Sequence, residues 1–232
     1  MCGRYTVVAD ANALKDRFEA EVTDDYIKHY NAAPSQLLPV ITAVAPHGFS
    51  FFYWGLVPDW SKNKSISTKL INARADSLLE KVSFRTAVHS RRCLVPADGF
   101  FEWKRINKKS KVPYRFILNE QQPFAFAGLW EAYENEQKEL VHTFTIITTE
   151  ANSLVKPIHD RMPVILTREA EKIWMNTDAP EDEVMGVLLP YDAMSMGQYA
   201  VSSKVNNVTN DDPSLIDPVA PADQFGNYSL FD

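Results

Sequence analysis

The chain has 232 residues, of which 45% are apolar, and it carries a net charge of −6 at neutral pH. This length and composition support a substantial buried core and favour a single domain, and no apolar run reaches the ~18–20 residues that a membrane helix needs. Cys2 and Cys93 are the two cysteines and no signal-like segment opens the chain, which argues against a disulfide framework and predicts a soluble, cytoplasmic protein, with a monomer as the default.

Short runs rich in β-branched and aromatic residues predict most of the secondary structure. In chain order, the predicted strands are 2–8, 38–44, 49–55, 93–96, 99–105, 113–118, 124–129, 141–149, 163–166 and 198–202. Helices are predicted at 10–20, 73–81, 150–156, 167–175 and 182–189, with Asp10 and Thr167 at N-cap positions.

Strands interspersed with short helices, and without a βαβ repeat, predict an α+β fold. We expect a single domain on a curved, largely antiparallel, barrel-like sheet with short peripheral helices. From Asn206 onward the chain is rich in Asn, Asp and Pro. We therefore place the domain at residues 1–217 and a loosely packed C-terminal tail at 218–232.

The charge is distributed unevenly. Between Ser61 and Lys111 there are 13 Lys or Arg and 4 Asp or Glu, whereas the remaining residues include 11 basic and 26 acidic ones. Aromatic residues lie within or just upstream of this segment: Trp54, Trp60, Phe84 and Trp103. Interleaved cations and rings favour a groove for a single nucleic-acid strand, in which cations follow phosphates and rings stack on bases. The alternative is a solvated basic loop, which suits the run from Lys104 to Lys111.

Cys2 follows the initiator methionine, so removal of Met1 would place an α-amine and a thiol on one residue. Such a 1,2-aminothiol can form a Schiff base with an aldehyde and then close a thiazolidine ring on the same carbon. The amine ordinarily titrates near ~7.7–8.0 and the thiol near ~8.5, so both nucleophilic forms are accessible near neutral pH. The alternative is that Cys2 is an ordinary first residue of a strand.

Four polar stretches end apolar runs: 71–76 (INARAD), 99–103 (GFFEW), 148–152 (TTEAN) and 158–163 (IHDRMP). Each alone is weak evidence, because a lone Glu in a strand usually faces solvent and a lone His is usually structural. No His, Cys or carboxylate cluster has the spacing of a zinc site, so we predict no metal and no cofactor.

Seven motifs occur in order over some 200 residues: MCGR at 1–4, NAAP at 31–34, WGLVPDW at 54–60, INAR at 71–74, FR at 84–85, RCLVPADGFFEW at 92–103 and IHDRMP at 158–163. The sequence VSSKVNN at 201–207 follows them. In this combination the chain closely resembles the SOS-response-associated peptidase (SRAP) family, whose members crosslink to abasic sites in DNA. An ordered set of motifs is far more specific than any one of them.

The resemblance implies roles for individual residues. Cys2 matches the nucleophile, Asn72 the amide that orients the new N-terminus, Glu102 the acid/base, and His159 the imidazole that assists opening of the sugar ring. The expected DNA-binding positions are Arg4, Arg74, Arg85, Arg161, Trp60, Trp103 and Pro34, with Asn31 beside Pro34 in the pocket floor. Trp103 matches an aromatic wedge, and Arg74 and Arg85 are the expected phosphate contacts.

The implied activity is covalent capture of abasic sites in single-stranded DNA through a thiazolidine at Cys2, which shields the site from strand cleavage during the DNA damage response. Lyase activity through an open Schiff base is a side path. The alternative is a cysteine-type (auto)peptidase that uses Cys2 with Glu102 and His159. A third hypothesis is a binding module without catalytic activity. The presence of all four central residues, Cys2, Asn72, Glu102 and His159, argues against it.

Overall fold

The computed structural model describes residues 2–61 and 64–227. Its strands are β1 (Tyr5–Val7), β2 (His29–Ala32), β3 (Leu37–Thr42), β4 (Ala45–Trp54), β5 (Asn72–Arg74), β6 (Arg92–Ala97), β7 (Gly99–Arg105), β8 (Lys111–Leu118), β9 (Phe124–Glu134), β10 (Leu140–Glu150), β11 (Arg161–Pro163), β12 (Ile165–Leu166) and β13 (Met196–Ala200). The α-helices are α1 (Ala11–Phe18), α2 (Val82–Ser90), α3 (Arg168–Met175) and α4 (Glu181–Gly186). Five 3-10 turns lie at Lys64–Lys69, Ala75–Ser77, Ala193–Ser195, Ser203–Asn206 and Pro213–Ile216.

Five strands close into a barrel, because β10, β4, β3, β6 and β9 pair in that order and β9 pairs back with β10. The β10–β4 pairing is parallel and the other four are antiparallel. All six residues of β6 are buried, as a strand covered on both faces requires. A Cβ at Gly128 of β9 would lie 2.8 Å from the Val95 side chain, so glycine permits the close approach of β9 and β6. This architecture confirms the expected α+β, barrel-like fold.

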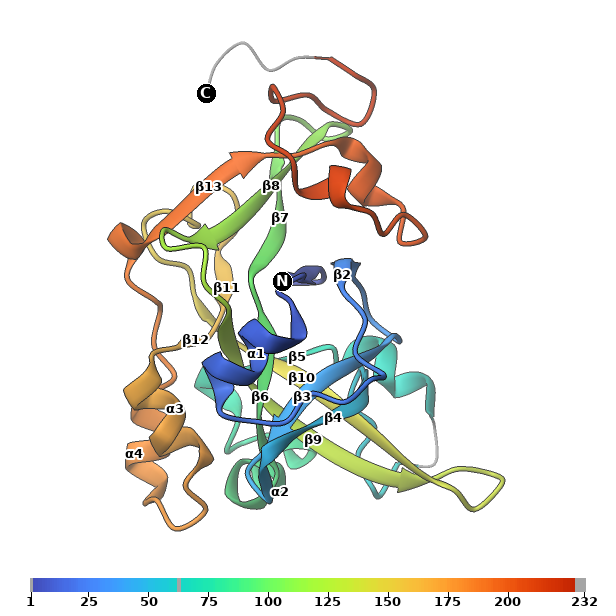
Figure 1. The fold of residues 1–232 in the computed structure, drawn as a ribbon, viewed down its shortest axis with the longest axis vertical. Coiled ribbons are helices and arrows are strands. Elements are labelled where there is room, and N and C mark those ends of the chain that lie inside the picture. The colour runs from blue at the N-terminus through green and yellow to red at the C-terminus, as the bar shows by residue number, and fades with distance from the viewer. Residues whose placement is uncertain (1, 62–63, 228–232) are drawn as a thin grey trace.

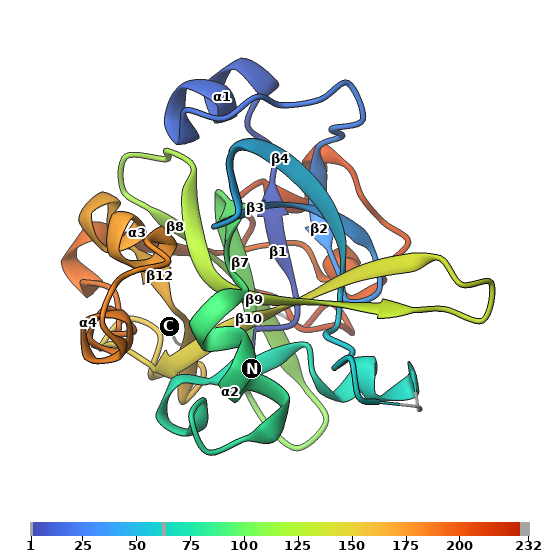
Figure 2. The same cartoon turned by 90° about the horizontal axis from the view of Figure 1, so that it is seen from below.

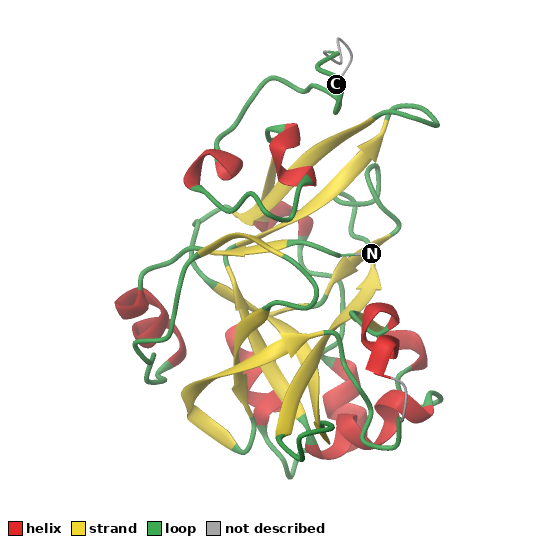
Figure 3. Ribbon diagram, turned by 90° about the vertical axis from the view of Figure 1, so that its right-hand side faces the viewer, coloured by secondary structure: helices red, strands yellow, loops and turns green. Residues whose placement is uncertain are grey.

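A second sheet of five strands, in the order β13-β8-β7-β1-β2, stands above the barrel (Figure 1). The N-terminus enters between the two sheets, next to β7 and β2 (Figure 1). Helices lie at the periphery of the strands (Figure 3), and α2 crosses the lower end of the barrel (Figure 2). A small core of Phe101, Val201, Val205 and Leu215 holds the 3-10 turns at 203–206 and 213–216 against the second sheet.

A buried carboxylate ties the N-terminal strand to the second sheet. Asp98 accepts hydrogen bonds from the hydroxyl of Thr6, the backbone amides of Val8 and Ala9, and the guanidinium of Arg115, whose Nη2 lies 2.9 Å from Oδ1. The Asp98 and Arg115 side chains are each 8% exposed. This ion pair is therefore shielded from water, and it fixes β1 against β7 and β8.

Most predicted elements are confirmed, including the helices predicted at 10–20, 167–175 and 182–189, which the structure places at 11–18, 168–175 and 181–186. Asp10 occupies the predicted N-cap position of α1 and its carbonyl accepts from the Leu14 amide at 3.0 Å, but its side chain pairs with Lys28 at 2.6 Å and makes no capping bond. Thr167 does cap α3, since its hydroxyl accepts from the Ala170 amide at 3.2 Å.

Two predicted helices are wrong. Within 73–81 the chain forms β5, which pairs in parallel with β10, followed by a 3-10 turn; the helix begins later, at Val82. Within 150–156, Glu150 ends β10 opposite Arg161, and the residues after it form hydrogen-bonded turns. Strand pairing with β10 overrides the local helical tendency at residues 73–74, whereas the residues after Glu150 form the connection between β10 and β11. The sequence reading missed β2 and α2, although Phe84, Ala87 and Val88 form a helical stripe.

The described part of the tail is anchored to the second sheet. Val219 donates a backbone hydrogen bond to Ala200, and the buried carboxylate of Asp223 accepts one from Ser110. Residues 228–232 of the predicted tail lie outside the described residues. Across the described part of the chain, no helix combines the length and apolar character needed to cross a membrane.

Replacing Asp98 with Ala should lower the free energy of unfolding by about 3–5 kcal/mol, because Arg115 would be left buried without its counter-ion. Urea denaturation measures this loss, and Asp16→Ala, at an exposed carboxylate, serves as the matched control. Equal unfolding midpoints for the two variants would contradict the assignment of Asp98 as the anchor of β1.

Candidate active site

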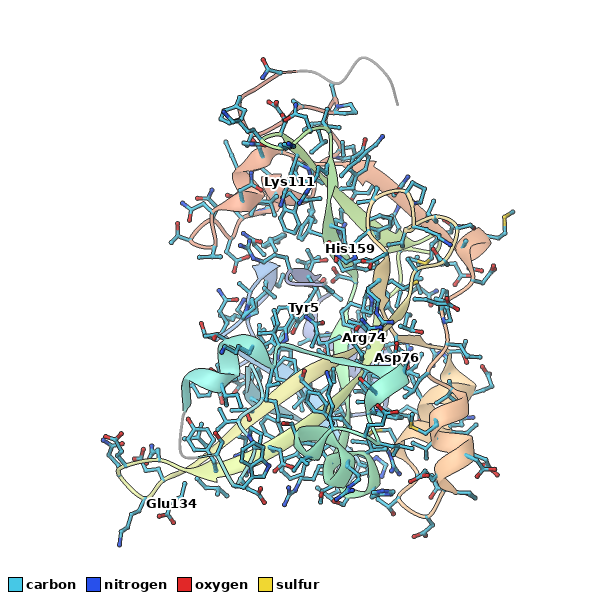
Figure 4. All side chains as sticks on the ribbon, turned by 180° about the vertical axis from the view of Figure 1, so that it is seen from behind. Tyr5, Arg74, Asp76, Lys111, Glu134 and His159 are labelled. Atoms are coloured by element: carbon cyan, nitrogen blue, oxygen red, sulfur yellow. The ribbon has the colours of Figure 1, made fainter. Side chains whose placement is uncertain are left out.

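The four central residues come from both sheets and meet where the sheets join. Cys2 precedes β1 and Glu102 lies in β7, its neighbour in the second sheet. Asn72 begins β5 and His159 precedes β11, and these two strands both pair with β10. Figure 4 shows His159 at this junction, between the upper sheet and the barrel.

Cys2 is fully buried. Its Sγ lies 3.7 Å from the carbonyl oxygen of Arg4, and its own carbonyl accepts a hydrogen bond from Asn72 Nδ2 at 2.8 Å. Burial raises the pKa of the Cys2 thiol far above its usual range, and the nearby carboxylate of Glu102 raises it further. The thiol is therefore held in its neutral form.

Asn72 is oriented by its strand and by Cys2. The parallel pairing of Asn72 with Ile146 of β10 fixes the backbone, and the bond to the Cys2 carbonyl fixes the amide. The other amide atom, Oδ1, is buried and accepts no hydrogen bond from the described residues. A buried acceptor of this kind is suited to a donor that arrives beside Cys2.

Glu102 is a buried carboxyl group with an exposed fraction of 3%. The β1–β7 register, in which Thr6 faces Gly99 and Tyr5 faces Phe100, brings Glu102 alongside the residues that precede β1. Burial raises the pKa of Glu102 to about 7. A carboxyl group with this pKa can both take up and release a proton near neutral pH.

His159 lies at the end of the turn between β10 and β11, with its side chain 27% exposed. Its Nδ1 lies 2.9 Å from the backbone nitrogen of Arg161, 3.1 Å from the Arg161 carbonyl oxygen and 3.0 Å from Asp160 Oδ1, so these two residues hold the ring in place. Partial burial lowers the pKa of His159 below its usual 6.5. The neutral ring therefore predominates at pH 7.

Two arginines share one carboxylate beside His159. Asp76 receives Arg74 Nε at 3.1 Å and Nη2 at 2.7 Å, and Arg161 Nη1 lies 3.5 Å from the same carboxylate. Arg161 is buried and also donates to the carbonyl of Thr148, whereas the side chain of Arg74 is 52% exposed. Figure 4 shows Arg74 and Asp76 next to each other below His159. Arg74 can meet a phosphate from solvent, and Arg161 holds the turn that carries His159.

Arg4 is committed to internal contacts. Its Nη1 donates to Asn31 Oδ1 and to the carbonyl of Val205, both at 2.8 Å. The amide of Asn31 in turn donates to the carbonyls of Val205, Asn207 and Asn210. These bonds join the NAAP and VSSKVNN motifs, so the structure gives Arg4 and Asn31 a bracing role that the sequence motifs do not reveal.

The remaining predicted DNA contacts are exposed or half-buried residues. Trp103 is half-buried, and its Nε1 donates to Asn206 Oδ1 at 2.6 Å. Side chains alternate along a strand, so Trp103 lies on the face of β7 opposite to Glu102. Arg85 is exposed on α2, Trp60 is 55% exposed after β4, and Pro34 is half-buried after β2.

Sequence reasoning missed Asp76 and Asp98, the two carboxylates that hold arginines in place. Asp76 belongs to the quoted INARAD stretch, and its position two residues after Arg74 was the available signal. Among residues 2–61 and 64–227, no group of three or more His, Cys, Asp or Glu side chains is arranged to hold a metal ion.

Comparison with known proteins places this site in a family. Residues 1–208 match the profile of the SOS response associated peptidase (SRAP) family, and the chain belongs to it. The abasic site processing protein YoqW of Bacillus subtilis is 44% identical over 222 residues, covering 94% of this chain and 99% of YoqW. The abasic site processing protein YMR114C of Saccharomyces cerevisiae is 32% identical, covering 92% of this chain and 59% of that protein.

Solved structures agree with the fold. A crystal structure of a Bacteroides thetaiotaomicron protein, 29% identical, superposes with a TM-score of 0.87 and covers 94% of this chain and 100% of that one. A Bordetella bronchiseptica protein, 26% identical, has a TM-score of 0.75 and covers 87% of this chain and 100% of that one. The expected family and fold are thereby confirmed.

The raised pKa of Glu102 predicts a pH dependence of stability. The folded state holds the Glu102 proton more tightly than the unfolded chain, so this contribution is complete below pH 4.5 and is lost as pH rises to about 7. Glu102→Gln should remove it, so that the variant gains up to about 3 kcal/mol relative to the parent between pH 4 and pH 8. Urea denaturation across this range measures the difference, with exposed Glu136→Gln as control. If the free energy of unfolding of the parent and of Glu102→Gln changed equally with pH, the raised pKa of Glu102 would be contradicted.

Proposed function

We propose that this chain processes abasic sites in single-stranded DNA by attaching Cys2 covalently to the exposed aldehyde. The observation that carries the proposal is the buried contact of the Asn72 amide with the Cys2 carbonyl, beside a carboxyl group whose pKa is about 7. The names of the relatives in Bacillus subtilis and Saccharomyces cerevisiae support the same substrate.

The first step opens the sugar. An abasic deoxyribose exists mainly as a closed hemiacetal, and ring opening requires a proton on the departing ring oxygen and loss of the proton from the hydroxyl on C1′. Neutral His159 can take up the C1′ hydroxyl proton on Nε2 and then donate it, as the imidazolium, to the departing ring oxygen, so that one proton moves between the two oxygens on C1′ and the imidazole ends neutral. The result is an aldehyde beside Cys2.

The second step joins protein and DNA. Once Met1 is removed, the Cys2 ammonium, with an ordinary pKa near ~7.7–8.0, can transfer a proton to the Glu102 carboxylate while Asn72 Oδ1 accepts a remaining N–H. The amine adds to the aldehyde carbon and one N–H proton passes to the oxygen, which gives a carbinolamine. Glu102 then protonates the hydroxyl so that it leaves as water, and the resulting Glu102 carboxylate takes the remaining N–H proton. A Schiff base remains.

The third step closes the ring. The Cys2 sulfur adds to the carbon of the C=N bond, and the thiol proton passes to the nitrogen, which gives a thiazolidine with the net loss of one water. The neutral thiol favoured by burial is the form that delivers this proton. Ring closure removes the iminium that would promote β-elimination, so the DNA strand stays intact and lyase activity is a minor path.

Arg74 supplies the phosphate contact of the proposal. Its Nε and one Nη2 donor engage Asp76, which leaves the remaining donors of a half-exposed guanidinium directed to solvent beside His159. A phosphodiester held there would bring the abasic sugar to Cys2. Arg85 and Trp60 extend this contact along the basic segment.

The alternative of a cysteine peptidase is less well supported. A peptidase nucleophile works as a thiolate whose pKa is lowered by a paired imidazolium. Here burial raises the pKa of Cys2 and lowers that of His159, and Nδ1 of His159 is engaged by the Arg161 amide.

Cys2→Ala should abolish covalent attachment to a single-stranded oligonucleotide with one abasic site, and Cys2→Ser should leave an amine adduct that cleaves the strand. Denaturing electrophoresis and intact-mass analysis of the methionine-processed protein measure both outcomes, with Cys93→Ala as the matched control. The expected product has the mass of protein plus DNA minus one water. Unchanged attachment by Cys2→Ala would refute the proposal.

Arg74→Ala should weaken binding of undamaged single-stranded DNA and reduce the slope of log K against log salt by about 0.7, the value for one lost phosphate contact. At saturating DNA, covalent attachment should continue because Cys2 and Glu102 are retained. Fluorescence anisotropy at several salt concentrations measures the slope. Arg168→Ala, an exposed arginine on α3, is the control, and an equal slope for both variants would contradict the role of Arg74.

A further inference from the structure

A second basic site lies at the tip of the β7–β8 hairpin, and we call it the hairpin pocket. Its volume is about 310 Å³, and it is lined by Trp103, Lys108, Lys109, Lys111, Asn206 and Gln224. Three of these six side chains are ammonium groups, two are amides, one is an indole, and none is acidic. In a chain with a net charge of −6, this composition favours an anionic ligand.

Hydrogen bonds to the C-terminal segment build the walls of the hairpin pocket. Gln224 accepts from the Lys111 amide at 2.9 Å and donates to the carbonyl of Lys109. Ser110 donates to Asp223, whose carboxylate also accepts from the backbone amides of residues 225 and 227. The lysine backbone is thus braced, while the three lysine side chains remain exposed.

The opposite wall belongs to the segment that packs on Arg4. The indole N–H of Trp103 donates to Asn206 Oδ1, and Arg4 Nη2 lies 3.5 Å from the Asn206 carbonyl. The hairpin pocket is therefore connected through Asn206 to the residues that precede β1. It is nevertheless separate from the cluster of Cys2, Glu102 and His159, because none of these residues lines it.

Trp103 and Lys111 lie on the face of the β7–β8 hairpin opposite to Glu102, so a DNA strand that runs from the candidate active site to the hairpin pocket passes round this hairpin. In Figure 4, Lys111, His159 and Arg74 follow one another from the top of the molecule downward. β7 continues for three residues beyond Glu102, about 10 Å at the rise of an extended strand, and Lys108 lies in the bend that follows it. A strand with its abasic sugar at Cys2 would have one flank at Arg74 and the other at the hairpin.

We propose that the hairpin pocket binds a backbone phosphate of the single-stranded DNA, on the side of the abasic site opposite to Arg74. This inference rests on the proposed function and extends the surface over which the protein contacts DNA. Lysine ammonium groups act as point charges for phosphate, and the lining offers no paired donors and acceptors for one particular base, so binding is independent of base sequence. Asn206 keeps the Trp103 indole in the wall of the pocket.

The test compares oligonucleotides of two lengths. The triple variant Lys108→Gln, Lys109→Gln, Lys111→Gln should bind an undamaged strand of about 15 nucleotides more weakly, with a salt slope reduced by about 0.7 for each phosphate lost. A strand of about 5 nucleotides, centred on the abasic site, should react with parent and triple variant at equal rates, because it does not span to the hairpin.

The control variant Lys15→Gln, Lys138→Gln, Lys172→Gln makes the same charge change at exposed lysines elsewhere. Equal slopes for the two triple variants on the long strand would overturn the proposal. Inorganic phosphate should compete with the long strand more strongly than chloride does at matched ionic strength, and this extra competition should be absent in the hairpin variant. Failure of the short strand to attach to any variant would instead count against the proposed function.

Discussion

The buried ion pair between Asp98 and Arg115 is the constraint on which the candidate site depends. Desolvated charges are stable only when paired and fully hydrogen-bonded, and Asp98 meets this condition by taking Thr6, Val8 and Ala9 as further donors. These donors all belong to the N-terminal strand or the turn after it. The charge pair therefore immobilises an N-terminal segment that would otherwise fray. Because Cys2 directly precedes this segment, the charge pair also fixes the position of Cys2.

Strand β10 provides the second half of this framework. It pairs with β9 and β4 in the barrel and with β5 and β11 near the site, so one strand determines where Asn72 and His159 lie. The resulting junction between two sheets excludes water from Cys2 and Glu102. That exclusion shifts the pKa of the Cys2 thiol upward and brings that of Glu102 to about 7.

The fold class and most strands were predictable, because the alternation of apolar and polar residues and the runs of β-branched residues indicate which strand residues are buried. The helix predicted at 73–81 was wrong because pairing with β10 outweighs local propensity where that segment begins. The helix predicted at 150–156 was wrong because Glu150 ends β10 and the residues after it turn back towards β11. For the site, motif resemblance named Cys2, Asn72, Glu102 and His159, whose proposed roles remain predictions. It could not reveal that Arg4 and Arg161 are largely committed to internal hydrogen bonds, because residue type alone does not distinguish a bracing arginine from one that meets phosphate.

By itself, the sequence determined the fold class and the family and predicted the reactive groups, since these depend on local pattern and on ordered motifs. Tertiary structure alone decided which charges are neutralised, which side chains are buried, and how the hairpin lysines are braced by Gln224 and Asp223. The physical reason is that solvation and electrostatic pairing depend on distances between residues far apart in the chain, and folding creates those distances.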